Sequence, residues 1–309
     1  MVRQPHLAVI PVHFPVVRPG EKLAQVVCDC LKDEGLTLRR GDIFAVASKI
    51  VSTCEGRVVR LTGVHVTARA KRLSDQWEID ERLAAVVVKE ADEILGGVDG
   101  FLLTVTNGIL TPNAGVDLKN SPPGTATLWP TNPDRSASQL RSRLQHRYKT
   151  KIGVLIVDSH VTPLRLGTVG LAIGLSGFVP IQDYRGVPDL FDRTIRVTQT
   201  NLADDIAAAA HLLMGESSER IGAVIIRGSA IGTDAKGDGR LLKLTQRKCL
   251  IGSALPNIGA TRLEGNDWAR NSYATTPELG CDLRNHCRRT DIVSDCRSRL
   301  LAPLSISFL

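Results

Sequence analysis

The chain has 309 residues, with 39 Lys and Arg against 32 Asp and Glu, a formal net charge of +7 and a pI near 9.2. At 43% hydrophobic and 23% charged residues it has the composition of one large or two modest globular domains, which excludes a disordered or fibrous protein. Aromatic residues make up only 4%, which argues against a stacking surface for single-stranded nucleic acid. Residues 231–309 hold 12 basic against 8 acidic residues, so most of the net positive charge lies in this last quarter and the rest of the chain is close to neutral. Nucleic acid is therefore not the expected partner.

The first half of the chain alternates short apolar runs, which predict buried strands, with helical periodicity, which predicts amphipathic helices. In chain order we expect a strand at 7–12, a helix at about 20–35, a strand at 43–47, a helical stretch over 67–95 and strands at 101–106 and 109–111. A Pro/Gly loop at 121–124 then precedes a basic helix that Ser136 is expected to cap and that runs to about residue 147.

The second half begins with the cleanest strand, residues 152–157, which is expected to stop at Asp158. A helix at 202–214 ends at Gly215, as a glycine C-cap predicts, and a strand follows at 222–226. The uncharged run at 166–182 is too short and too rich in glycine for a membrane span. Together these elements predict an α+β (mixed α/β) fold.

Seven cysteines, an odd number in a chain of this length, indicate reduced thiols and a cytoplasmic protein rather than a disulfide scaffold. Cys28 and Cys30 fall in the first expected helix and are interpreted as packing residues. A second cluster lacks the paired Cys-x-x-Cys spacing of a zinc site: Cys281, His286, Cys287 and Cys296. The N-terminal residues are not expected to form a signal peptide, because a proline and a histidine interrupt their apolar stretch.

Acidic residues stand where expected elements end, the usual place for functional groups. Asp117 lies in a polar turn after a strand, Asp158 and Ser159 follow the cleanest strand, and Glu216 follows a helix. Hard oxygen ligands of this kind suit Mg²⁺ or Mn²⁺, although isolated carboxylates are more commonly solvated or capping residues. His160 follows a strand-end aspartate and is the better candidate for a site histidine, since the other well-placed histidine lies inside a helix and is interpreted as structural.

Six short motifs occur in a fixed order along the chain. They are Asn113-Ala-Gly-Val-Asp117-x-x-Asn120, the strand into Asp158-Ser159, Ala172-Ile-Gly-Leu-Ser-Gly177, Asp183-x-Arg-Gly-x-Pro-Asp189-Leu-Phe, Ala203-Asp-Asp-Ile-Ala-Ala and Leu213-Met-Gly-Glu216. In this order they resemble the coenzyme F420-0:γ-glutamyl ligase family. The resemblance covers about residues 7–230. We therefore expect a ligase-like domain at 1–255 and an irregular tail at 256–309, where periodicity is lost.

The resemblance implies a homodimer whose subunits have two intimately connected lobes with a nucleotide and metal cleft between them. It implies a GTP-dependent ligase that adds L-glutamate to the terminal carboxylate of F420-0 through an acyl phosphate, with no membrane partner. Mg²⁺ or Mn²⁺ is the implied metal, and K⁺ is a further candidate ion.

The implied residues carry over by motif. The metal ligands are Asp117, Asp158, Ser159 and Glu216, and the catalytic residues are Asp158 and Arg165. The nucleotide contacts are Phe14, Pro15, Val16, Val17, Ser48, Lys49, Asn120, Met214, Gly215, Ser217, Ser218 and Ile221.

Two departures from the family pattern leave alternatives open. Thr53 stands where the family usually has a lysine, and it cannot replace that charge on a phosphate. The loop from Asp158 to Arg165 carries His160 and Pro163 where the family pattern is shorter and glycine-containing. The alternatives are the same ligase chemistry on a different carboxylate acceptor, or a nucleotide- or metal-binding homologue without turnover.

Overall fold

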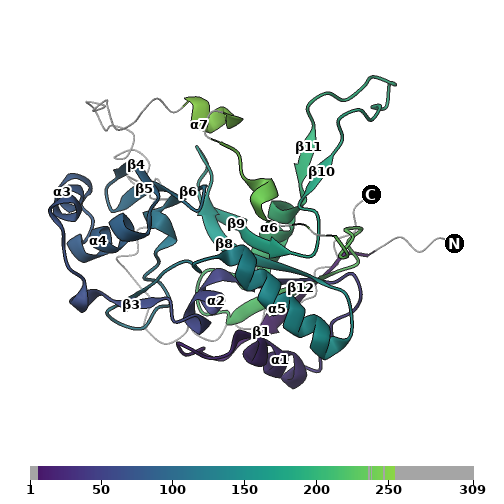
Figure 1. Cartoon of the computed structure of the whole chain (residues 1–309), viewed down its shortest axis with the longest axis horizontal. Helices are drawn as coiled ribbons and strands as arrows, with labels where there is room; N and C mark the ends of the chain where they lie inside the picture. The colour runs from purple at the N-terminus through teal and green to yellow at the C-terminus, as the bar shows by residue number, and fades with distance from the viewer. Residues whose placement is uncertain (1–5, 236, 238, 246–247, 255–309) are drawn as a thin grey trace, which may run out of the picture. The chain divides into compact units, whose positions relative to one another are not determined.

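Apolar strands from distant parts of the chain assemble into one five-stranded mixed sheet (Figure 1). This computed structural model describes residues 6–235, 237, 239–245 and 248–254. The strand order is β1-β12-β2-β8-β9; β2 runs parallel to β8, and the other pairs are antiparallel. The strands are β1 (Ala8–His13), β2 (Ile43–Ala47), β8 (Gly153–Val161), β9 (Thr168–Ser176) and β12 (Ile221–Arg227).

Helices cover both faces of this sheet. Helices α1 (Leu23–Asp33) and α5 (Pro133–Tyr148) share one buried cluster with one set of strand side chains, and α6 (Leu202–Met214) shares another with the opposite set. Along β8 the alternation is clear: Val154 and Ile156 pack toward α1 and α5, whereas the intervening Leu155 packs toward α6. Successive residues of β8 therefore belong to different layers.

A third apolar cluster forms from residues between 59 and 128. Two helices pack beside a three-stranded antiparallel sheet of order β4-β5-β6, which lies at the left of Figure 1. The elements of this region are β3 (Val58–Arg60), η1 (Leu61–Gly63), α3 (Ala68–Trp77), α4 (Glu81–Glu90), β4 (Glu93–Val98), β5 (Phe101–Thr106), β6 (Ile109–Pro112), η2 (Asn113–Gly115) and β7 (Thr125–Thr127).

Strands β10 (Ile181–Asp183) and β11 (Gln199–Asn201) pair antiparallel and carry a long connection that projects from the sheet in Figure 1. The connection exposes large apolar side chains: Leu190 is 98% exposed and Phe191 is 76% exposed. The remaining elements are α2 (Ser48–Cys54), η3 (Gly239–Leu242) and α7 (Leu250–Ala254).

The structure confirms the expected α+β class and most of the expected elements, with α6 spanning the predicted 202–214. The helical prediction over 67–95 is wrong in its middle and at its end. Glu78 adopts a left-handed conformation (φ 47°) that ends α3, and the Asp80 carboxylate caps α4 by accepting hydrogen bonds from two backbone N–H groups. Ile94, assigned to that helix, lies in β4 beside two glycines that disfavour a helix.

Two further expectations are corrected. The N-cap of α5 is Asn132, whose Oδ1 accepts a hydrogen bond from the Arg135 N–H at 3.0 Å, and Ser136 lies inside the first turn. Strand β8 does not stop at Asp158, because β9 pairs with it as far as Val161. Strand β9 itself was not predicted, since its glycines conceal the apolar pattern.

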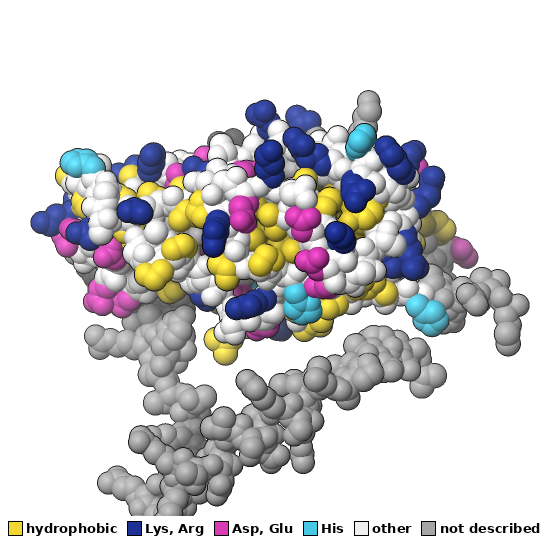
Figure 2. All heavy atoms as spheres, turned by 90° about the horizontal axis from the view of Figure 1, so that it is seen from below, with side chains coloured by type: hydrophobic (Ala, Val, Ile, Leu, Met, Phe, Trp, Pro, Cys, Tyr) yellow, Lys and Arg dark blue, Asp and Glu magenta, His cyan; other side chains and the backbone are white. Residues whose placement is uncertain are grey.

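In the described part of the chain the cysteines, Cys28, Cys30, Cys54 and Cys249, are free, and Cys30 is buried among packing residues as expected. None of the described helices is long and apolar enough to cross a membrane. On the face shown in Figure 2, Lys and Arg side chains are interspersed with Asp, Glu and hydrophobic side chains. The predicted tail at 256–309 and the second cysteine cluster lie outside the described residues.

Candidate functional site

The site begins where β2 ends. In the parallel β2–β8 pair, Ile43 lies opposite Gly153 and Ala47 lies opposite Val157. Helix α2 starts at the residue after β2, Ser48. Asp158 is therefore the first residue of β8 without a β2 neighbour. The carboxyl ends of the two parallel strands bring Ser48 and Asp158 together at one edge.

Two donors fix the Asp158 carboxylate. The Ser48 hydroxyl donates to Oδ1 at 2.6 Å, and the Trp129 indole N–H donates to Oδ2 at 2.6 Å. Burial raises the pKa of Asp158, and the negative charge of Asp117 adds to this effect, whereas the two hydrogen bonds and the Lys49 charge oppose it. An acid whose charge is disfavoured by burial gains from a nearby cation.

A tight turn presents Asp117 to the same region. Asn113 and Ala114 both have positive φ, and the Val116 N–H donates to the Asn113 carbonyl at 2.9 Å. Asp117 then pairs with Thr127 through two backbone hydrogen bonds, each 2.9 Å. Its side chain leaves this turn toward α2, where the Lys49 ammonium lies 2.6 Å from Asp117 Oδ2.

Glu216 reaches the cluster from the end of α6. The helix ends at Gly215, whose φ is 68°, a conformation that favours glycine. The Glu216 Oε1 atom accepts from Thr168 Oγ1 at 2.7 Å and lies 2.9 Å from His211 Nε2, and Oε2 accepts from the Lys119 ammonium. Burial alone would raise the pKa of Glu216, but these hydrogen bonds outweigh it and lower the pKa to about 2.

The Lys119 ammonium contacts Glu216. Its hydrogen bond to Glu216 raises the pKa of the ammonium, and the negative charges of Glu216, Asp117 and Asp158 all act in the same direction. Beside it, the Asn120 amide donates to the Ser217 carbonyl at 2.8 Å. Segments about a hundred residues apart in sequence, 117–120 and 216–217, are thus held side by side.

The chemistry of these donors fits a divalent cation. Each of two lysine ammonium groups contacts one of these carboxylates: Lys49 contacts Asp117, and Lys119 contacts Glu216. Across the residues that the structure describes, no three His, Cys, Asp or Glu side chains form a cage for a metal. Mg²⁺ is usually held by one or two carboxylates together with substrate phosphates.

Ser159 points into the other layer. Successive strand residues face opposite sides, so Ser159 faces α6 while Asp158 faces Trp129 and α5. Across the hairpin from Ser159, Gly170 leaves room for α6: a Cβ at this glycine would lie 2.1 Å from the Ala207 carbonyl oxygen. Ser159 and Glu216 therefore approach from the α6 side, and Asp117 and Asp158 from the other.

Most of the predicted nucleotide residues lie in two connected segments, 14–17 and 214–221. Phe14 is buried, its N–H donates to the Arg220 carbonyl at 2.8 Å, and its ring fills the space beside Gly222. This contact places the loop at 14–17 next to the start of β12, which follows the other segment, 214–221. The loop exposes Val16, which is 80% accessible.

Arg165 is not brought to the carboxylates. It lies exposed in the β8–β9 turn, where its N–H donates to the Thr162 carbonyl at 3.2 Å, and its guanidinium makes no ion pair with any described residue. The two histidines differ in their contacts. His211, interpreted as structural, contacts Glu216, while the Nδ1 atom of His160 is buried with no hydrogen-bond partner in the described structure.

Trp129, Thr168 and Lys119 were also missed. Each acts on a predicted carboxylate from a distant part of the chain, so no local spacing could reveal it. His211 did carry a local signal, because it stands one helical turn before the end of α6, five residues ahead of Glu216.

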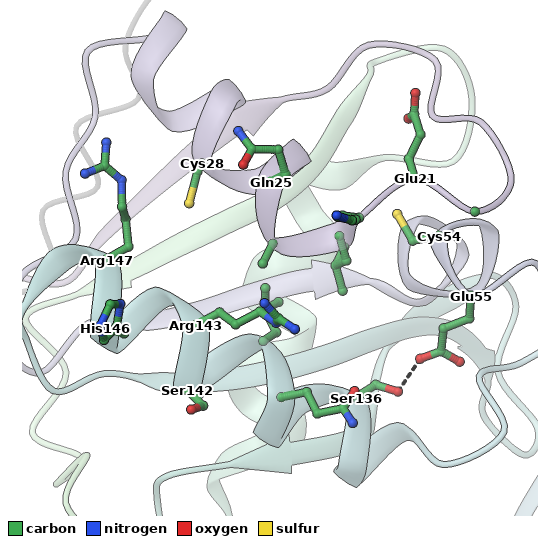
Figure 3. Close-up of a pocket in the computed structure, with 16 residues that line it drawn as sticks. Glu21, Gln25, Cys28, Cys54, Glu55, Ser136, Ser142, Arg143, His146 and Arg147 are labelled. Carbon is green, nitrogen blue, oxygen red and sulfur yellow. Dashed lines mark hydrogen bonds between the residues drawn. The ribbon is translucent and has the colours of Figure 1, made fainter.

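A separate cavity of about 960 Å³ lies between α1 and α5 (Figure 3). Gln25 and Cys28 of α1 face Arg143 and Arg147 of α5 across it, and Cys54 lies at one end. None of the predicted metal, nucleotide or catalytic residues lines this cavity.

Known proteins with similar sequences match most of the described chain. The family described as F420-0:Gamma-glutamyl ligase matches residues 11–228. Coenzyme F420:L-glutamate ligase of Methanopyrus kandleri is 39% identical over 213 residues, which cover 69% of this chain and 82% of that protein. The proteins of the same name from Methanothermobacter thermautotrophicus and Archaeoglobus fulgidus are each 35% identical, over 70% and 71% of this chain and 86% and 87% of theirs. The order of motifs, the clustered carboxylates and these matches agree, and the chain is an enzyme of the F420-0:gamma-glutamyl ligase family.

Proposed function

We propose that this protein joins L-glutamate to the terminal carboxylate of F420-0 in a reaction driven by GTP and dependent on Mg²⁺ or Mn²⁺. The observation that carries the proposal is a linked set of carboxylates and lysines from separate segments. Lys49 contacts Asp117, and Lys119, two residues after Asp117, contacts Glu216. Asp158 accepts a hydrogen bond from Ser48, the residue before Lys49. The names of the relatives support γ-glutamyl ligation. The arrangement of charges supports chemistry on a phosphorylated substrate.

In the proposed reaction an oxygen of the F420-0 carboxylate attacks the γ-phosphorus of GTP. The bond from that phosphorus to the leaving oxygen breaks, which releases GDP and leaves an acyl phosphate. The amine of L-glutamate then attacks the acyl carbon, phosphate departs with the bonding electrons, and the amine gives up one proton as the amide forms. No oxidation or reduction is involved.

The protein's part in this scheme is chiefly to position and neutralise charge. Asp117 and Asp158 would hold the divalent ion, which would neutralise negative charge on the transferring phosphoryl group. Ser48 fixes the rotation of the Asp158 carboxylate through its 2.6 Å hydrogen bond. When nucleotide binds, Lys49 would exchange its contact with Asp117 for a contact with a phosphate oxygen. Ser159 and Glu216 would contribute metal ligands from the α6 side.

Four parts of the proposal extend further. K⁺ is a candidate second ion for the carboxylates, and cytoplasmic location is the expectation from the reduced thiols. A homodimer is proposed through the projecting β10–β11 connection, because Leu190 and Phe191 expose apolar surface that a second copy would bury. Arg165 is proposed to reach the acceptor carboxylate from the exposed hairpin turn.

The test is mass spectrometry of F420-0 incubated with the purified full chain, GTP, L-glutamate and Mn²⁺. We expect a product heavier by one glutamyl residue that is absent without GTP. Asp158→Asn should abolish the product while leaving the thermal unfolding midpoint within a few degrees, and Asp75→Asn, an exposed aspartate on α3, should change neither.

The outcomes separate the alternatives. Product formation by Asp158→Asn at the wild-type rate would contradict the site assignment. GTP consumption with another carboxylic acid, but not with F420-0, would favour a different acceptor, for which the changed loop from Asp158 to Arg165 is the motivation. Binding of GTP with no turnover on any acceptor would indicate a homologue without ligase activity.

A further inference from the structure

Trp129 contacts both the Asp158 carboxylate and the turn that leads to Asp117. It is 5% exposed, follows β7 by two residues and packs in the cluster beneath α1 and α5. Its backbone carbonyl accepts a hydrogen bond from Arg57 Nε at 3.0 Å, so the main chain is held as well as the ring. A buried indole normally finds a hydrogen-bond partner for its N–H, and this one finds Asp158.

The face of the indole supports the turn that carries Asp117. Gly115, two residues before Asp117, has φ +71°, and a Cβ added there would lie 2.3 to 2.5 Å from three atoms of the Trp129 indole. No side chain fits at this position. The ring is therefore in direct contact with the backbone of the 113–117 turn.

A closed set of contacts results. Asp117 is tied to Thr127 by two backbone hydrogen bonds, Thr127 is two residues from Trp129, and Trp129 donates to Asp158 at 2.6 Å. The same rigid ring that limits how closely the turn can approach also fixes one oxygen of the β8 carboxylate. The ring therefore contacts both the turn before Asp117 and the Asp158 carboxylate.

We propose that Trp129 is a positioning residue that sets the spacing of Asp117 and Asp158 for the divalent ion, through its N–H on one side and its contact with Gly115 on the other. This inference rests on the proposed function. The remaining lone pairs of the Asp158 oxygens stay available, because each oxygen of a carboxylate can accept more than one interaction. Partners of this type typically alter metal affinity by 10- to 100-fold when they are removed.

The first test is a titration of the full chain with Mn²⁺ in the absence of nucleotide, in which binding is measured from the relaxation of water protons. Trp129→Phe keeps an aromatic ring but removes the N–H, and we expect it to bind Mn²⁺ about tenfold more weakly with a little-changed unfolding midpoint. Trp77→Phe is the matched control: Trp77 is partly buried in the third cluster, and no hydrogen bond of its indole N–H is found in the described structure. It should leave the Mn²⁺ affinity unchanged.

The second test displaces the turn instead of the N–H. Gly115→Ala should also weaken Mn²⁺ binding about tenfold, because the new methyl group must push the turn away from the ring. Gly124→Ala is the control for backbone strain, since Gly124 has φ +72° but no atom within 4 Å of the position that its new methyl group would take. If both changes act through the same spacing, the double variant of Trp129 and Gly115 should lose less than the product of the two single losses.

A readout independent of the ion keeps the two proposals distinguishable. The Trp129 indole N–H resonance should shift in Asp158→Asn and in Gly115→Ala, but not in Gly124→Ala. If the wild type and Trp129→Phe bind Mn²⁺ with equal affinity, the positioning role of Trp129 is overturned and the proposed function still stands. Wild-type protein that binds no Mn²⁺ would instead overturn the proposed metal site and, with it, the role assigned to Trp129.

Discussion

The Lys49 ammonium lies 2.6 Å from Asp117 Oδ2 and also donates to the Lys119 carbonyl. A lysine so placed can transfer its charge from a carboxylate to a phosphate. We predict that Lys49→Met weakens GTP binding in the presence of Mg²⁺ by about tenfold, or ~1.4 kcal/mol, in calorimetric titration. Lys71→Met, an exposed lysine on α3, should bind GTP like the wild type. Equal GTP affinity in the two variants would remove Lys49 from the nucleotide site.

Lys119 is expected to compete with a divalent ion, because its ammonium contacts Glu216 and the negative charges of Asp117 and Asp158 also raise its pKa. Removing that charge in Lys119→Met should tighten Mn²⁺ binding about threefold to tenfold and make it less dependent on salt. The measurement is a Mn²⁺ titration at two salt concentrations. Weaker binding in the variant would show that Lys119 instead supports the ion site by holding Glu216 in place.

The acid sensitivity of the metal-free protein should reflect Glu216. Its folded pKa of about 2 is below the ordinary value of 4.5, so its stabilising effect is present above about pH 4.5 and is lost as the pH falls toward 2. In EDTA, the free energy of unfolding of the wild type should exceed that of Glu216→Gln at pH 7, and the gap should narrow between pH 5 and pH 3. A gap that widens on acidification would contradict this assignment.

A buried ion pair joins the start of β2 to the end of β12. Asp42 is 1% exposed, and Arg227 donates to its two oxygens at 2.9 and 2.7 Å. Arg227→Met leaves that carboxylate uncompensated, so urea unfolding should show a loss of about 3 to 5 kcal/mol. Adding Asp42→Asn should recover part of the loss. The exposed Arg69→Met provides the comparison and should change stability by less than about 0.5 kcal/mol.

The β10–β11 connection should decide the oligomeric state. Leu190→Asp and Phe191→Asp place charges on surface that the proposed homodimer would bury, and each should shift the protein toward monomer in sedimentation experiments. Leu212→Asp, on an exposed position of α6, is a control of the same chemistry. If the protein stays dimeric in both Leu190→Asp and Phe191→Asp, the dimer interface lies outside the β10–β11 connection.

Much of the fold could be predicted because its strands are continuous apolar runs. β2 and α6 match their predicted bounds, since both faces of β2 are buried and α6 has a clear glycine end. Strand β9 escaped prediction because Gly170 and Gly174 replace side chains where α6 and the start of α5 approach the sheet closely. The break after Trp77 escaped as well, because the left-handed conformation of Glu78 has no strong sequence signal.

In the candidate site, too, some residues could be predicted from the sequence and others could not. Asp117, Asp158 and Glu216 could be singled out because they stand at element ends in recognisable motifs, and their role as metal ligands stays a prediction. Their supporting residues could not be predicted, because a contact such as Trp129 with Asp158 depends on the packing of segments that no periodicity relates. His160 and His211 show the limit: position after a strand or inside a helix did not reveal which ring would meet a carboxylate.

The early end of β2 has a consequence for how the chain can change in length. Strands β8 and β9 stay paired past the last β2 neighbour, and their register already contains one irregularity, between Ile156 and Val157 of β8. Inserting or deleting one residue just before Asp158 would send Asp158 toward α6 and Ser159 toward Trp129. Each side chain would then face the wrong set of partners without any substitution. The residue count of β8 up to this point is thus as strict a requirement for the site as the identity of its carboxylates.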